Sequence, residues 1–222
     1  MAELINPGRG RVARLFLSAF GLLLAIVVLL WAIEIVDTFV LGDRLQRNGI
    51  QPRSTDGLDG VLWAPLLHSD FGHVVSNTVP FLVLGWLVAL RGFRFWFTVT
   101  AFSVIAGGGL VWLLAGGSNH IGASGVVFGY FGALMGAAIR SRQPATLAPA
   151  MVAIFLYGTI LVGIVPQDDI SWEGHLFGLL TGLAAALMVV ERRPRLSQVE
   201  HDDPNDIMYP WEIDEPWRRA EE

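Results

Sequence analysis

Long apolar runs are the feature that most limits what this 222-residue chain can fold into. A helix needs about 20 apolar residues to cross a hydrocarbon core of about 30 Å. Because lipid offers the backbone no hydrogen-bond partners, such segments form helices and not open sheets. Only 16% of the residues are charged, against roughly 25% in a typical soluble domain. We therefore predict an all-α membrane protein with six spans, over residues 16–36, 74–90, 95–114, 126–139, 147–165 and 176–190.

Arginine residues indicate how the predicted spans are oriented. Most fall before the first span, between the second and third, between the fourth and fifth, and after the sixth, at Arg9, Arg11, Arg14, Arg91, Arg94, Arg140, Arg142, Arg192, Arg193 and Arg195. Only the long loop after the first span breaks this pattern, with Arg44, Arg47 and Arg53. Basic residues concentrate on the cytoplasmic side of membranes. We therefore expect a protein of the cell membrane with both termini in the cytoplasm. The first run is too long for a signal peptide, and no cleavage site follows it.

The chain divides into three predicted parts. Residues 1–14 form a cytoplasmic amino-terminal segment, and residues 15–190 form the membrane domain. Residues 191–222 form an acidic tail whose composition is typical of disorder. Between the first two spans lies a long external loop, and we expect its apolar stretch 61–67 to lie in the membrane interface as a short amphipathic piece.

Several kinds of chemistry are excluded or carry no signal. Cysteine is absent, so neither a disulfide framework nor a thiolate metal site is possible. No basic patch with interleaved aromatic residues occurs, so nucleic acid is not an expected partner. We predict no cofactor and no metal. Glu34 and Asp37, near the end of the first span, are expected to be solvated and receive no chemical role. The sequence does not indicate an oligomeric state.

A serine between glycines opens the fourth span. Ser124 lies in the sequence G-A-S-G, between Gly122 and Gly125. A Gly-x-Ser-Gly turn allows the backbone to approach a substrate closely and leaves the hydroxyl unobstructed. Ser124 is therefore a candidate nucleophile. The alternative is that small residues at the head of a membrane helix serve only packing.

Other polar residues are predicted to lie at the depth of Ser124. Even-numbered spans run from the outside inward, so His73, Asn77 and His175 all fall near the outer face. Polar side chains in a bilayer are costly and usually face the bundle interior. His73 and Asn77 are four residues apart on one helix face, which suits two hydrogen-bond donors for an oxyanion. The alternative is that these side chains only join neighbouring helices.

Glycine spacing predicts that the fourth and sixth spans are close neighbours. Glycines four residues apart let two helices approach closely, and they occur here as Gly132 with Gly136 and as Gly178 with Gly182. Such an approach brings His175 within reach of the serine. A serine hydroxyl is a useful nucleophile when a neighbouring base takes its proton.

Three motifs together resemble the rhomboid intramembrane serine proteases. They are H-S-D-F-G-H-V-V-S-N at 68–77, G-A-S-G at 122–125 and G-H-L-F-G-L-L-T-G at 174–182, and the resemblance covers 61–190. It implies a six-helix rhomboid fold in which Ser124 and His175 form a catalytic dyad. It also implies supporting places for His68, Gly122, Gly125, Phe128, Gly178 and Gly182, with His73, Asn77 and the Ser124 amide as the oxyanion donors.

Three residues depart from the pattern that the resemblance implies. Trp63 is followed by Ala64, where the family commonly has a Trp-Arg pair. Phe128 stands where the family often has a tyrosine that stacks on the histidine. His120 matches no feature of the family, and we expect it to be an interfacial residue. None of these differences removes a catalytic atom.

The motifs therefore predict a protease that hydrolyses peptide bonds in or beside transmembrane segments of other proteins. His175 is the expected general base and then acid, and no aspartate is placed to orient it. The resemblance implies lateral substrate access past the fifth helix, with residues 166–172 as a movable cap. Two alternatives stay open: a catalytically inactive relative that binds membrane clients, and a small proton-coupled transporter.

Overall fold

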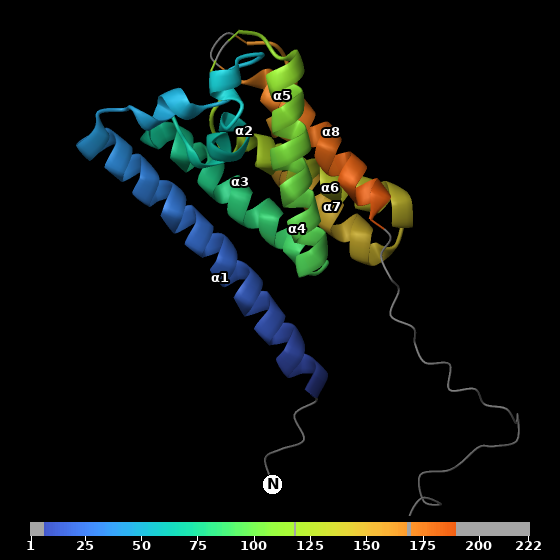
Figure 1. Cartoon of the computed structure of the whole chain (residues 1–222). Helices are drawn as coiled ribbons and strands as arrows, with labels where there is room; N and C mark the ends of the chain where they lie inside the picture. Colours follow the sequence, from blue (N-terminus) through green and yellow to red (C-terminus); the bar gives the residue numbers. More distant parts are fainter. Residues whose placement is uncertain (1–6, 118, 168–169, 190–222) are drawn as a thin grey trace, which may run out of the picture. The chain divides into compact units, whose positions relative to one another are not determined.

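The computed structural model describes residues 7–117, 119–167 and 170–189 (Figure 1). Within those ranges the regular structure is helical, and extended pairing is limited to one isolated bridge between Ile50 and His120. The expected acidic tail, 191–222, lies outside the described residues, and the expected cap, 166–172, includes two residues that do as well. The fold below is therefore that of the membrane domain.

Six helical segments make up most of the described chain. They are α1 (Pro7–Val36) with the π-helical turn η1 (Asp37–Leu41), α3 (Phe71–Ala89), the series α4 (Phe93–Phe102), η5 (Ser103–Gly107) and α5 (Gly108–Leu114), α6 (Ser124–Ser141), α7 (Pro144–Tyr157) with the 3₁₀ segment η6 (Gly158–Ile164), and α8 (Trp172–Met188). Helix α1 begins inside the segment expected to precede the membrane domain.

Four of the described segments are long and apolar enough to cross a membrane. They are Ser18–Leu41, Phe71–Ala89, Phe93–Leu114 and Pro144–Ile164. Helices α6 and α8 are shorter, with 18 and 17 residues. The expectation of six spans is therefore supported for four segments, and the crossing of the membrane by α6 and α8 remains a proposal.

Helices α6 and α8 meet backbone against backbone through their glycines. A Cβ atom added at Gly178 would overlap the Gly125 carbonyl, and one added at Gly182 would overlap the Gly129 carbonyl. In the other direction, a Cβ at Gly132 would overlap the Leu179 carbonyl. Such contacts need residues without side chains. The close approach of these two helices is what the glycine spacing predicts.

The remaining helices enclose this pair. Helix α6 carries the two largest fully buried side chains among the described residues, Tyr130 and Phe128. The Tyr130 hydroxyl lies 3.0 Å from the Thr100 hydroxyl of α4, and Phe81 of α3 packs against its ring. Helix α1 lies along α3 (Figure 1), where the Trp31 indole donates to the Thr78 hydroxyl at 3.1 Å. The core therefore joins the helices around α6.

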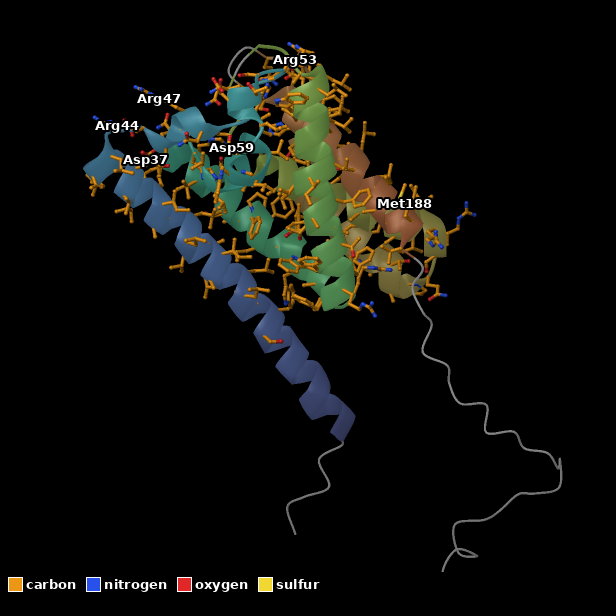
Figure 2. All side chains as sticks on the ribbon, in the orientation of Figure 1. Asp37, Arg44, Arg47, Arg53, Asp59 and Met188 are labelled. Carbon is orange, nitrogen blue, oxygen red and sulfur yellow. The ribbon has the colours of Figure 1, made fainter. Side chains whose placement is uncertain are left out.

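The segment between α1 and α3 is docked on the bundle by Arg53 and Trp112. The Arg53 guanidinium donates to the Ala115 carbonyl at 2.7 Å, and the Trp112 indole donates to the Ser54 carbonyl at 2.8 Å. Figure 2 shows Arg53 beside the carboxyl end of α5. Arg53 and Trp112 thus dock this segment in a chain that lacks the family's Trp-Arg pair, because Trp63 is followed by Ala64.

That segment contains four short helical pieces, η2 (Leu45–Asn48), η3 (Thr55–Gly57), α2 (Gly60–Trp63) and η4 (Ala64–Leu66). The last two cover most of the apolar stretch 61–67. Within the last two, Leu62 and Trp63 are exposed while Ala64 is buried. The expected position of this stretch in the membrane interface stays a prediction.

The expectation that Glu34 and Asp37 are solvated is wrong. Each side chain is 2% exposed. After η1 the chain reverses at Gly42, whose φ is +62°, and the following residues return over the end of α1. The Asp37 carboxylate accepts the Leu45 backbone N–H at 2.9 Å. A buried carboxylate needs such a partner, and the sequence did not indicate that the loop would supply it.

Candidate active site

Ser124 and His175 are hydrogen-bonded to each other. The Ser124 Oγ lies 2.8 Å from the His175 Nε2. Ser124 is the first residue of α6, and His175 lies in the first turn of α8. The glycine contacts between these helices bring the two first turns together. The structure therefore places a hydroxyl and an imidazole within the distance that a nucleophile and its base require.

A backbone carbonyl determines which nitrogen of His175 carries the proton. The His175 Nδ1 lies 2.9 Å from the Gly163 carbonyl oxygen of η6. A carbonyl only accepts, so Nδ1 is the donor and Nε2 presents its lone pair to Ser124. In a Ser-His-Asp triad an aspartate holds the histidine in this tautomer. Here the Gly163 carbonyl does so.

Phe128 and Gly163 fix the position of the imidazole. The Phe128 ring stacks on the His175 ring with centroids 4.3 Å apart and planes 7° from parallel. A Cβ at Gly163 would lie 2.9 Å from the His175 Nδ1 and 3.2 Å from the tip of Phe128. Glycine is therefore the residue that fits at position 163. Sequence reasoning missed Gly163, because a backbone carbonyl gives no signal in a motif.

His73 is oriented by Ser69. The Ser69 N–H and the Ser69 hydroxyl lie 3.5 and 3.2 Å from the His73 Nδ1. The Ser69 hydroxyl donates its hydrogen to the Asp70 carboxylate at 2.9 Å, so the backbone N–H, which only donates, is the Ser69 donor to Nδ1. This contact favours the neutral tautomer with its hydrogen on Nε2. A Cβ at Gly122 would lie 2.6 Å from that Nε2. Gly122, with φ +113°, therefore gives the ring access to the turn before Ser124.

Asn77 lies one helical turn after His73 and is buried. Its side-chain N–H donates to the His73 carbonyl at 2.9 Å. The amide group carries two N–H donors and one carbonyl acceptor, so this bond leaves a donor for a ligand. His73 and Asn77 therefore form one local unit at the start of α3.

These side chains share the wall of one cavity of about 550 Å³. Ligand sites typically measure about 300 to 1,000 Å³. Polar groups line it from three helices and from the loops that precede them: Ser69, His73, Ser76, Asn77, Asn119, Ser124, Ser171 and His175. Apolar side chains line the rest: Pro80, Ile121, Val127, Phe128, Ile160 and Ile170. The four residues that the motifs single out are thus brought to one concave surface.

His68 supports the site from behind the cavity. Its Nε2 accepts the Ala123 N–H at 3.4 Å, and its ring meets the His73 ring edge-on at 5.0 Å. Burial, together with the neighbouring His73, lowers the pKa of His68 to about 4. The ring is therefore a neutral structural contact between His73 and the serine turn at physiological pH.

His120 is not the interfacial residue that the sequence suggested. Its side chain is 3% exposed. The Nδ1 lies 2.6 Å from the Ser171 hydroxyl, and its backbone pairs with Ile50. The expectation was wrong because the docked loop covers the residue, which nothing in the local sequence indicates.

Among the described residues, no group of three His, Cys, Asp or Glu side chains is arranged to hold a metal ion.

Comparisons with known proteins agree with the motifs. The family model described as "Rhomboid domain" matches residues 58–192. An uncharacterized protein of Mycobacterium tuberculosis is 40% identical over 185 residues, covering 78% of this chain and 77% of the relative. An uncharacterized protein of Mycobacterium leprae is 37% identical over 195 residues, covering 82% and 77%. The matched region contains every residue of the cavity wall named above.

Proposed function

Since this membrane protein belongs to the rhomboid family, we propose that it is an intramembrane serine protease. Its substrates are other membrane proteins, cut in or beside a transmembrane segment. The observation that carries this proposal is the 2.8 Å contact between Ser124 and a His175 whose other nitrogen is held by the Gly163 carbonyl. That arrangement presents an unprotonated Nε2 to the hydroxyl, as general-base catalysis requires.

Acylation begins when the Ser124 Oγ attacks the carbonyl carbon of the scissile peptide bond. The His175 Nε2 accepts the hydroxyl proton as the new C–O bond forms. The resulting imidazolium then donates that proton to the peptide nitrogen. The C–N bond breaks, the amine product leaves, and Ser124 is left as an ester. Covalent catalysis of this kind divides one difficult step into two easier ones.

Deacylation repeats the sequence with water as the nucleophile. Neutral His175 takes a proton from the water as its oxygen attacks the ester carbon. The second tetrahedral intermediate collapses, the bond to Ser124 Oγ breaks, and the imidazolium returns the proton to that oxygen. The second product leaves as a carboxylic acid. The dyad is then ready for another substrate.

The negative oxygen of each tetrahedral intermediate needs hydrogen-bond donors. We assign this role to the His73 Nε2–H, the Asn77 side-chain amide and the Ser124 backbone N–H. The first N–H groups of a helix have no acceptor within it, and the positive end of the helix dipole favours an anion there. Each donor of this type is worth on the order of 100-fold to 1000-fold in rate.

Helix α7 and the following η6 provide the proposed route for the substrate. Only 11% of an 18-residue apolar window in Pro144–Ile164 is buried, and Ile160 of η6 lines the cavity. An element with so few buried side chains separates from its neighbours at low cost. We therefore place lateral access past α7. The proposed location is the cell membrane, with both termini in the cytoplasm and the dyad toward the outer face.

The experiment that tests this function is cleavage of a transmembrane reporter by the purified protein in detergent. We expect the wild type to cut the reporter, and Ser124→Ala, with an unchanged melting temperature, to leave it intact. A client-binding relative without activity would retain the reporter uncut in both proteins. Uncut reporter with folded wild type, over a range of reporter sequences, would contradict the proposal.

A further inference from the structure

Two hydrogen bonds join the segment around Ser124 to the segment around His175, and each connects residues that are 51 positions apart in the chain. Ser124 and His175 are 51 residues apart and lie 2.8 Å from each other. His120 and Ser171 are also 51 residues apart, with 2.6 Å between Nδ1 and Oγ. The second pair therefore precedes the first by four residues on both segments. It repeats the contact of the dyad at the point where the two loops lead into α6 and α8.

His120 is held firmly on its own side of this contact. Its backbone N–H donates to the Ile50 carbonyl at 2.9 Å, and its carbonyl accepts the Ile50 N–H at 2.9 Å. The side chain is buried as well. The imidazole is therefore a fixed point, tied to the docked loop as well as to the serine turn.

Ser171 is attached to the first turn of α8. Its carbonyl accepts the His175 backbone N–H at 3.1 Å. A shift of Ser171 therefore shifts the backbone of the base itself. The Glu173 carboxylate adds a second tie by accepting the Gly116 N–H at 3.1 Å.

The hydrogen arrangement of the pair follows from its neighbours. The His120 Nε2 lies 3.5 Å from the Gly116 carbonyl, which only accepts, so Nε2 is the donor and Nδ1 accepts the Ser171 hydroxyl hydrogen. Burial lowers the pKa of His120, which favours this neutral form. Among the described residues, Glu173 is a charged group near enough to the ring to act on this pKa, and it raises it.

We propose that His120 and Ser171 are a positioning pair that aligns Ser124 with His175 in the reaction proposed above. The first turn of a helix lacks intrahelical partners for its N–H groups and opens more easily than its middle. Both dyad residues lie in such first turns. The bond between His120 and Ser171 joins the two loops just before those turns, and so limits how far the hydroxyl and the base can separate.

The test measures kcat and KM for reporter cleavage by Ser171→Ala, His120→Phe and the double variant. Because a misplacement of about 1 Å can cost about 100-fold, we expect kcat to fall by about 10-fold to 100-fold in each single variant. KM should stay within about twofold, because alignment acts in the transition state. The double variant should be no slower than the slower single variant, since both remove one interaction.

Conservative variants separate alignment from general structural damage. Ser171→Thr keeps the hydroxyl and His120→Asn keeps an acceptor near the Nδ1 position, so both should regain most of the lost kcat. Thr98→Ala is the matched control, because it removes a side-chain bond of 2.8 Å to the Arg94 carbonyl in α4, away from the cavity. It should cleave like the wild type.

The outcomes distinguish this inference from the function on which it rests. If the wild type cuts the reporter and Ser171→Ala retains its kcat, the positioning pair is refuted while the protease stands. Additive losses in the double variant would refute it too. If the folded wild type cuts no reporter, the proposed function fails and the pair loses its role. Should His120→Phe not fold, Ser171→Ala and Ser171→Thr decide the question.

Discussion

The pair α6 and α8 and the segment α7 with η6 are built in opposite ways. Eleven residues of α6 are buried, three of α7 are, and none of η6 is. Glycines join α6 to α8 backbone against backbone, whereas α7 exposes large apolar side chains such as Phe155, which is 87% exposed. Helices α6 and α8 therefore hold their residues in fixed positions. The segment α7 with η6 exposes most of its side chains to the surroundings of the protein.

The proposed dyad depends on both regions. Ser124 and His175 come from the closely packed helices α6 and α8, but the Gly163 carbonyl that orients His175 comes from η6. Displacing η6 therefore removes the partner of the His175 Nδ1 while the Ser124 contact with α8 can persist. The comparison indicates that the rigid region sets the distance within the dyad and the loosely packed region sets the tautomer.

The largest effect on stability is expected at the contact between α6 and α8, where no space is left for a side chain. Gly182→Ala places a Cβ against the Gly129 carbonyl, and α6 and α8 must then separate. We expect a loss of stability beyond about 4 kcal/mol, the range of the most damaging substitutions, seen as a large drop in melting temperature. Gly109→Ala is the control, because a Cβ there meets nothing within 4 Å. Equal melting temperatures would contradict the close packing.

A large effect on rate, without an effect on folding, is expected at the oxyanion donors. Asn77→Ala removes one donor, which typically costs on the order of 100-fold to 1000-fold in kcat. The melting temperature should change little in comparison, since the His73 carbonyl remains within its helix. Cleavage at the wild-type rate would show that Asn77 only joins turns of α3.

A smaller effect is expected at the ring that stacks on the base. An aromatic contact is worth about 0.5 to 1.5 kcal/mol, yet a misaligned base can cost about 100-fold. Phe128→Ala should therefore lose much of the rate, and Phe128→Tyr, which keeps the ring, should retain most of it. Phe128→Leu keeps an apolar side chain without the stack. Full activity in Phe128→Leu, with folding checked by thermal melt, would refute the stacking role.

The smallest effect concerns pH and His68. Burial holds the pKa of His68 at about 4, against an ordinary value of about 6.5. Between these values the unfolded chain binds more protons than the folded one, so stability falls as the pH falls through this window. We expect His68→Asn to lose less melting temperature than the wild type between pH 7 and pH 5. An identical or larger loss would contradict the neutral, buried assignment.

Some features were predictable because residue type alone determines them. Gly178 and Gly182 predict a close helix contact, since backbones approach only where side chains are absent. Apolar runs predict the four spanning segments to within a few residues, because length and hydropathy decide them. The motifs predict that His73, Asn77, Ser124 and His175 share one depth, and the structure brings them to one cavity.

Other features were not predictable because they depend on the path of distant segments. Gly163 orients the base through a backbone carbonyl, which any residue possesses. His120 and Asp37 are buried where loops return over them, and their local sequence resembles that of exposed residues. Helices α6 and α8 are short, and their buried positions depend on the packing around them. In each case the deciding contact lies far away in the chain.

The central claim is that Ser124 is a nucleophile activated by His175. It is tested most directly by incubating the purified protein with a fluorophosphonate probe and locating the adduct by peptide mass spectrometry. We predict one adduct on Ser124 in the wild type, none in Ser124→Ala, and labelling slowed by orders of magnitude in folded His175→Ala, because its hydroxyl has lost its base. Equal labelling of Ser124→Ala, or undiminished labelling of His175→Ala, would contradict the claim.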